Sequence, residues 1–243
     1  MKRKIVVVVC IIMLICISTI SNFLFSPEEV IVRYEQHVNA PQTQDSGSIE
    51  NGDLISHLPL INISTNSQKI PGFPIRGEDG HVMYYDTGIN GEKEIKVEVK
   101  IYENEQAQNS IKNKEELKSN AFFRIRGNSS RSFDKNSYKI SFIDEQNMPQ
   151  EHEVMGMAKG EEWALYGPFL DKTLIRNYMW LNISAKIMGY APNVRFCECY
   201  IDGKYQGLYV MMETIEKSKE RVNIATYDKD SRVIPALLSK RDV

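Results

Sequence analysis

Alternating apolar and polar residues mark two short stretches near the middle of the chain, 122–126 and 138–142. A period of two is typical of a half-buried β-strand, in which successive side chains point to opposite faces of the sheet. The apolar positions of both stretches therefore face a core, and Arg126 and Lys139 share the polar face. The pattern predicts a hairpin whose outer face carries these two cations.

The loop between the two strands is polar, with a glycine followed by Asn128, Ser129 and Ser130. Gly127 lets the backbone come close to a ligand, and the amide and hydroxyl groups add hydrogen bonds. Together with the two cations, this loop predicts an anion cradle. The alternative is a solvated hairpin with scattered charge, which periodicity alone favours because charge on the outer face of a strand is ordinary.

The same reasoning predicts strands elsewhere in the chain. Asp202-Gly203 is a strong hairpin turn signal between two strand-like stretches. The remaining predicted strands are short apolar runs or strictly alternating stretches. The strands expected outside the central hairpin are 58–64, 94–102, 163–166, 195–201 and 208–215.

One helix is predicted in the second half of the chain, at 171–189. Asp171 is a good N-cap residue, Gly189 suits the position after the last turn, and Pro192 prevents continuation. With the antiparallel hairpins, this helix indicates a mixed α+β fold. The apolar face of the helix is expected to consist of Leu174, Tyr178, Leu181, Ala185 and Met188.

The N-terminus opens with Lys2-Arg3-Lys4, and an apolar run follows from residue 5 to residue 25. About 21 residues at 1.5 Å rise span the roughly 30 Å of a bilayer core, and the basic flank stays cytoplasmic. The small residues of a cleavage site are poorly matched. Residues 1–25 are therefore predicted to be an uncleaved signal anchor, with a cleaved signal peptide as the alternative. Either way the domain lies outside the cytoplasm.

Composition is that of one domain with flanking segments. The chain has 243 residues, of which 42% are hydrophobic and 26% charged, and its net charge of -2 argues against nucleic acid as the main partner. Residues 26–56 are polar and turn-rich and suit an extracellular tether, so the domain is expected at 57–243. Cys197 and Cys199 are predicted to be buried thiols, and no zinc-site spacing occurs.

Two further charged residues are candidates for binding. Arg176 lies near the start of the predicted helix, where the helix dipole does not favour a cation, so it calls for a phosphate or a carboxylate partner. An ordinary salt bridge explains it equally well. Glu213 ends the last predicted strand, where it either serves a site or is a solvated carboxylate.

The stretch RIRGNSSRSFDKNSYKISF resembles the signature of the CotH kinase family, in which an Arg-Gly-Asn-Ser run precedes a Lys-rich strand. The resemblance continues in the family's order through Glu213. Arg131 departs from the pattern, because many relatives carry an aromatic residue there, and it either weakens loop packing or adds a phosphate contact. The downstream blocks are 174–177, 188–192 and 200–209.

The resemblance implies a divergent protein-kinase-like fold and an atypical kinase that phosphorylates secreted or spore-coat proteins with ATP and Mg²⁺. It implies phosphate binding by the central loop and its flanking cations, with Glu213 orienting a lysine. The protein partner implied is the substrate, and the membrane is contacted through the N-terminal helix. The nucleotide-binding residues expected are Arg126, Asn128, Ser129, Lys139, Arg176 and Glu213.

The catalytic acids are not assigned. In the family, the metal-binding acids lie after the second hairpin and its following helix, and no Asp pair before Val243 fits them by motif. We expect this chain to be truncated before those acids. Three hypotheses stay open: an extracytoplasmic CotH-type kinase, a catalytically dead membrane-anchored binding module, and a structural coat or cell-surface protein.

Overall fold

The computed structural model describes residues 13, 33–39, 48–50, 53–104, 108–188, 190–218 and 221–222. The chain divides into two units, Met1–Val32 and Arg33–Val243. All elements described below belong to the second unit.

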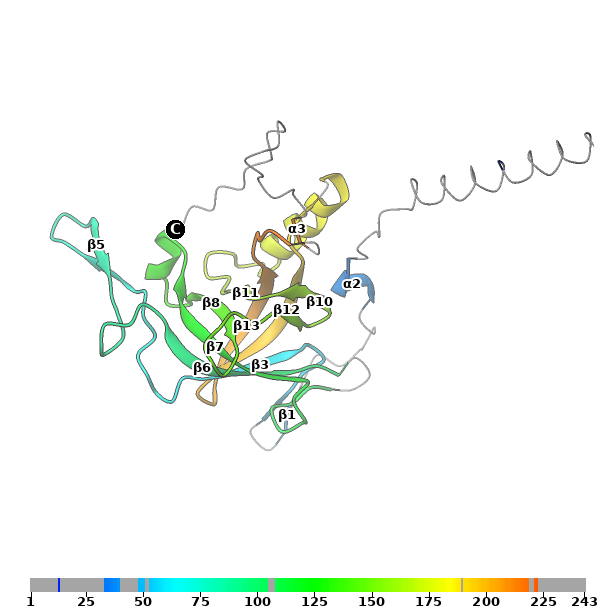
Figure 1. Cartoon of the computed structure of the whole chain (residues 1–243), viewed down its shortest axis with the longest axis horizontal. Coiled ribbons are helices and arrows are strands. Elements are labelled where there is room, and N and C mark those ends of the chain that lie inside the picture. The colour runs from blue at the N-terminus through cyan, green and yellow to red at the C-terminus, as the bar shows by residue number, and fades with distance from the viewer. Residues whose placement is uncertain are drawn as a thin grey trace, which may run out of the picture. The chain divides into compact units, whose positions relative to one another are not determined.

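Seven strands of this unit close into a β-barrel (Figure 1). Their order around the barrel is β11-β13-β12-β3-β6-β7-β8, and β11 pairs with β8 to complete the ring. Neighbouring strands are antiparallel except β12 and β3, which are parallel. The strands are β3 (Leu60–Ser64), β6 (Ile95–Tyr102), β7 (Leu117–Arg126), β8 (Ser137–Ile143), β11 (Glu162–Tyr166), β12 (Val194–Ile201) and β13 (Lys204–Glu213).

The barrel closes because every strand contributes an apolar inner face. In β6, for example, Ile95, Val97 and Val99 are buried while the alternating residues face outward. Trp163 and Leu165 bring the short strand β11 into the same core. A closed ring leaves no edge of the sheet unpaired, which is the physical gain over an open sheet.

The predicted α+β, protein-kinase-like fold is therefore wrong for the part of the chain that the structure describes. The predicted antiparallel hairpins exist, but they are parts of one barrel rather than of an open kinase-like sheet. The described helical elements are few: α2 (Gln36–Asn39), α3 (Arg176–Ile187) and the 3-10 helix η1 (Ser129–Ser132), besides the single residue Met13.

The prominent helix is shorter than predicted. It begins at Arg176 rather than at residue 171, because Leu174 has a φ of 62° and a left-handed residue interrupts the helix there. Asp171 still caps the helix, although it lies five residues before Arg176 in the sequence. Its Oδ2 accepts a hydrogen bond from the Arg176 backbone N–H at 2.8 Å. Tyr178 and Asn182 are its buried side chains, whereas Met188 is exposed.

Residues 33–39, from the segment predicted as a tether, pack against the barrel wall. Gln36 pairs with the backbone of Phe196, accepting from its N–H at 2.8 Å and donating to its carbonyl at 3.2 Å. Arg33 donates to Asn182 of α3 at 2.9 Å and to the carbonyls of residues 191 and 192 at 2.8 Å each. This segment thus fixes α3 beside β12.

Three small hairpins complete the described structure. One of them, β9 (His152–Val154) with β10 (Met157–Gly160), contributes Val154, Met155 and Met157 to the barrel core. The other two are β1 (Ser48–Glu50) with β2 (Asp53–Ile55), and β4 (Pro74–Arg76) with β5 (Val82–Tyr85).

The fold prediction also placed a membrane helix at 1–25. Apart from Met13, that segment lies outside the described residues. Within the ranges that the structure describes, no helix has the length and apolar character needed to cross a membrane.

Candidate functional site

The outer face of β7 and β8 carries the cations that the sequence singled out. Arg124 lies opposite Lys139 in the antiparallel pairing, and Arg126 lies opposite Ser137. Since opposed residues share a face, Arg126 and Lys139 both point outward, on the same side of the sheet, while Phe123 and Ile125 point into the core. The predicted alternation of this hairpin is found.

Two carboxylates join these cations, and we call the set the outer cluster: Arg124, Arg126 and Lys139 with Glu94 and Glu162. Lys139 Nζ lies 2.7 Å from Glu162 Oε1 and 3.6 Å from Glu94 Oε1. Arg124 Nε donates to the same Glu94 oxygen at 2.9 Å. The outer cluster therefore has three cations and two anions.

Arg126 is the one cation of the outer cluster that does not pair with Glu94 or Glu162. No hydrogen bond or ion pair joins its guanidinium to another described residue. Burial lowers the pKa of Arg126, the neighbouring charge of Arg124 lowers it further, and Glu162 acts in the opposite direction. A half-buried cation that repels another cation favours the arrival of an anion such as a phosphate.

The loop after Arg126 turns sharply at Gly127, whose φ is 110°. A Cβ at this position would lie 2.1 Å from Ser130 Oγ, so both the backbone conformation and the close contact require glycine. Asn128 and Ser129 follow with exposed side chains at the start of η1. The loop thus presents an amide and a hydroxyl next to Arg126 in the chain.

Arg131 packs this loop and is not available to a ligand. It is 5% exposed, and its guanidinium donates to the carbonyls of Gly127 and Gly72 and lies 4.0 Å above the Tyr85 ring. The sequence left two roles open for Arg131, weaker loop packing or a phosphate contact, and the structure shows neither. It joins the central loop to the segment around Gly72.

Two candidate residues are engaged elsewhere. Glu213 is buried at the end of β13, where it accepts hydrogen bonds from the backbone and side-chain N–H groups of Asn193 at 2.8 and 2.9 Å. Burial and then the charge of Glu213 raise the pKa of Tyr190. Arg176 is exposed and lies 3.9 Å from Asp171. Lys139 forms its ion pairs with Glu162 and Glu94 rather than with Glu213.

The sequence did not single out Glu94 or Glu162. Glu162 lies beside Lys139 because β8 pairs with β11, with Lys139 opposite Ala164. It lies one residue before the predicted strand 163–166 and is the first residue of β11, and only the pairing of β11 with β8 shows which cation it meets.

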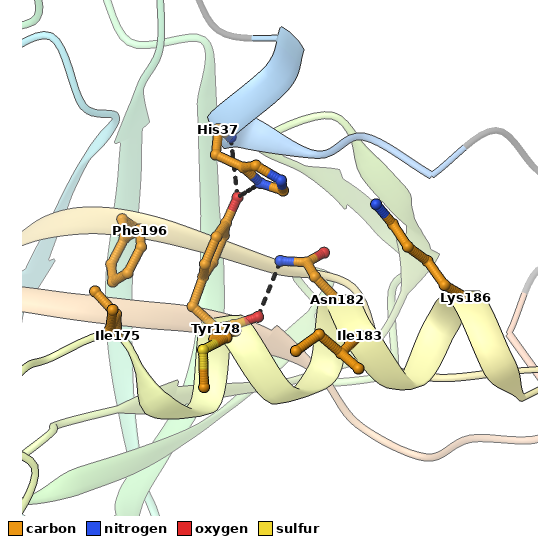
Figure 2. Close-up of a pocket in the computed structure, with 8 residues that line it drawn as sticks. His37, Ile175, Tyr178, Asn182, Ile183, Lys186 and Phe196 are labelled. Carbon is orange, nitrogen blue, oxygen red and sulfur yellow. Dashed lines mark hydrogen bonds between the residues drawn. The ribbon is translucent and has the colours of Figure 1, made fainter.

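A separate pocket of about 380 Å³ lies between α3 and residues 33–39 (Figure 2). Within its lining, His37 Nδ1 and the hydroxyl of Tyr178 form a hydrogen bond of 2.7 Å. None of the predicted phosphate-binding residues lines this pocket, so it is distinct from the outer cluster. Its lining residues are His37, Ile175, Tyr178, Met179, Asn182, Ile183, Lys186 and Phe196.

The two described cysteines belong to the hydrophobic core of the barrel. Cys197 and Cys199 are free, fully buried thiols on the inner face of β12, as predicted, and burial raises the pKa of both. Among the described residues, no group of three or more His, Cys, Asp or Glu side chains could hold a metal ion.

Comparison with known proteins shows that part of the chain matches the model of one protein family. The family model described as CotH kinase protein matches residues 123–238, from the first inward phenylalanine of the central hairpin to beyond β13. No curated protein matches the chain. The resemblance to the CotH kinase family is thereby confirmed over residues 123–238.

Proposed function

We propose that this protein is an extracytoplasmic CotH-type atypical protein kinase, which transfers the γ-phosphate of ATP to Ser or Thr residues of secreted or spore-coat proteins. The family match supports the general class. The observation that carries the proposal is the outer cluster. In it, half-buried Arg126, whose guanidinium pairs with no other described residue, lies on one face with the Lys139–Glu162 ion pair of 2.7 Å.

The residues of this face fit the phosphates of a nucleotide. Arg126 would bind phosphate oxygens with its guanidinium fork, and Lys139 would neutralise charge as a point cation. Glu162 holds the Lys139 ammonium in place, and Asn128 and Ser129 offer hydrogen bonds from the loop. ATP, when bound, supplies the phosphoryl group that is transferred.

The metal is not assigned to residues. Family members use Mg²⁺, but the described part of the chain offers no cluster of acidic side chains to hold it. The proposed role of this domain is therefore to bind and orient the nucleotide phosphates.

The extracytoplasmic location is part of the proposal. It is supported by Lys2-Arg3-Lys4 ahead of the apolar run at 5–25, which is the order of charge and hydrophobicity found in export signals. A reporter enzyme that is active only after export, fused after residue 60, is expected to be active. Activity of a cytoplasm-only reporter at the same position would contradict the assignment.

Nucleotide binding tests the site directly. Arg126→Gln and Lys139→Met are each expected to weaken binding of a fluorescent ATP analogue about tenfold, because each removes a charge-assisted contact to phosphate. The measurement is a titration followed by fluorescence anisotropy. The matched control is Lys100→Met on β6, whose ammonium pairs with Glu98 at 3.2 Å, and it should bind like the unmodified chain.

The outcome also decides the function. Equal affinities in all four proteins would show that the outer cluster is not the nucleotide site. Transfer is then measured with labelled ATP, Mg²⁺ or Mn²⁺ and a Ser-rich acceptor. Binding that depends on Arg126 but gives no transfer would favour a nucleotide-binding module over a kinase.

A further inference from the structure

The hairpin of β4 and β5 is an exposed apolar element that the proposed nucleotide site does not use. We call residues 73–85 the arm, and Figure 1 shows it extending away from the barrel wall. All four residues of β5 are exposed, and Met83 and Tyr84 are 69% and 58% exposed. Exposed Tyr, Met and Phe side chains gathered on one element are typical of an interaction surface. The exposed large apolar side chains of the arm are Phe73, Val82, Met83, Tyr84 and Tyr85.

The root of the arm is held rigidly by Asp86. One carboxylate oxygen, Oδ1, accepts hydrogen bonds from the N–H groups of Gly72 and Phe73 at 2.8 and 2.7 Å. The other oxygen lies 2.8 Å from Lys69 Nζ. These contacts fix the direction in which the arm leaves the barrel.

The arm is also joined to the loop of the proposed nucleotide site. Arg131 donates to the Gly72 carbonyl at 3.2 Å and lies over the Tyr85 ring. Nearer the tip, Arg76 Nη2 donates to Ser132 Oγ at 3.1 Å. A molecule bound along the arm is therefore held beside residues 127–132.

The backbone of the arm indicates what kind of molecule that is. Among the described strands, β5 pairs only with β4, and β4 only with β5, so each has one free edge. Pro74 has no N–H, which leaves β4 with an incomplete set of donors, whereas every residue of β5 has one. A free edge of this kind is completed by another extended backbone, whose N–H and C=O groups have the same spacing.

From these observations we infer that β5 binds an extended segment of the acceptor protein as an added strand, with apolar side chains of that segment against Met83 and Tyr84. This inference rests on the proposed function, since it assigns the arm to the protein substrate of the kinase. A lipid or a small apolar molecule would use the side chains but would leave the hydrogen-bonding groups of the edge unmatched.

Amide hydrogen exchange of the full chain tests strand addition, with dephosphorylated casein as an unfolded, Ser-rich probe. Casein is expected to slow exchange of the β5 amides, residues 82–85, at least tenfold. The double variant Met83→Ser/Tyr84→Ser should bind fluorescent casein about tenfold more weakly while binding ATP normally. Because both side chains are exposed, the variant should fold like the unmodified chain.

The matched control is Met148→Ser/Ile187→Ser, which removes two side chains of similar exposure, 60% and 79%, outside the arm. It should bind casein normally. The inference is overturned if β5 exchange is unchanged by casein, if the two double variants bind casein equally, or if protection of β5 appears with rising concentration of the chain alone, which would identify a second copy as the occupant.

Failure of the inference and failure of the proposed function are distinguishable. Protection of β5 by casein without any phosphate transfer contradicts the kinase proposal and leaves the docking strand in place. Phosphate transfer to casein that the Met83→Ser/Tyr84→Ser change does not affect contradicts docking through the arm and leaves the kinase proposal in place.

Discussion

Replacing Glu103 by alanine is expected to lower the free energy of unfolding of the barrel by about 3–5 kcal/mol. Glu103 Oε1 lies 2.6 Å from Nη2 of Arg195, and both side chains are almost fully buried. Arg195 also donates to the Met155 carbonyl and lies 4.0 Å above the ring of Tyr34. Without the carboxylate, a buried guanidinium whose Nε already has no hydrogen-bond partner would lose its only anionic partner among the described residues.

A surface glutamate on β6, the strand that Glu103 directly follows, gives the matched control. Glu98 on β6 pairs with Lys118 at 2.9 Å and Lys100 at 3.2 Å, but all three side chains are partly open to water. Glu98→Ala should therefore cost only about 0–1 kcal/mol. Urea unfolding followed by tryptophan fluorescence compares the two, with Trp163 in the core as the reporter.

A double variant provides a second comparison. In the double variant Glu103→Ala/Arg195→Met no charge is left buried, so part of the lost stability should return. If Glu103→Ala and Glu98→Ala lower the free energy of unfolding equally, the buried Glu103–Arg195 pair contributes no more to stability than a surface pair, which would contradict the prediction.

Local alternation was enough to predict the central hairpin and the face of each of its residues. Arg126 and Lys139 point outward because Ile125 and Tyr138, opposite each other in the register, point inward. The hairpin of β12 and β13 was likewise predicted from Asp202-Gly203, although β13 begins at Lys204 rather than at residue 208. In both cases the strands are adjacent in sequence, so the turn fixes the pairing.

Closure of the barrel could not be predicted in this way. It depends on β12 pairing in parallel with β3, where Glu198 meets Leu60, and on the five residues of β11 pairing with both β8 and β13. A period of two says which face of a strand is buried but not which strands lie beside it. An open sheet and a closed barrel give the same alternation.

The same limit applies to the candidate site. Arg126 and Lys139 of the outer cluster were found because they alternate with core residues on two adjacent strands. Glu162 was missed because it reaches Lys139 across the β8–β11 pairing. Glu213 was expected to orient a lysine, but it ends β13 opposite Trp163 and bonds to Asn193 instead. Carboxylates come to their partners through tertiary contacts that local patterns do not contain.

Arg131→Ala is expected to cost about 3 kcal/mol of stability without removing any contact to a ligand. The Arg131 guanidinium is buried, and it donates to backbone carbonyls of Gly127 and Gly72 and stacks on Tyr85. Hydrogen bonds from a charged donor contribute about 1.5–3 kcal/mol, and a cation–π contact about 1 kcal/mol more. Alanine would leave both carbonyls without this donor.

The substitution Arg131→Lys separates charge from geometry. A lysine keeps the positive charge but has no planar fork that reaches two carbonyls, so it should recover less than half of the loss. Arg76→Ala removes an exposed arginine that bonds to Ser132 of the same loop, and it should cost only about 0–1 kcal/mol. Urea unfolding and ATP-analogue binding are measured on all three variants.

The two measurements together decide what Arg131 does. If it packs the loop, Arg131→Ala lowers stability most, and binding weakens only as far as the central loop becomes disordered, with Arg131→Lys intermediate in both. If Arg131 instead contacted phosphate, Arg131→Ala would leave the free energy of unfolding unchanged and weaken nucleotide binding tenfold, and Arg131→Lys would restore most of that binding. The second result would contradict the loop-packing role, because it would show that the contacts of Arg131 with Gly127 and Gly72 contribute nothing to stability.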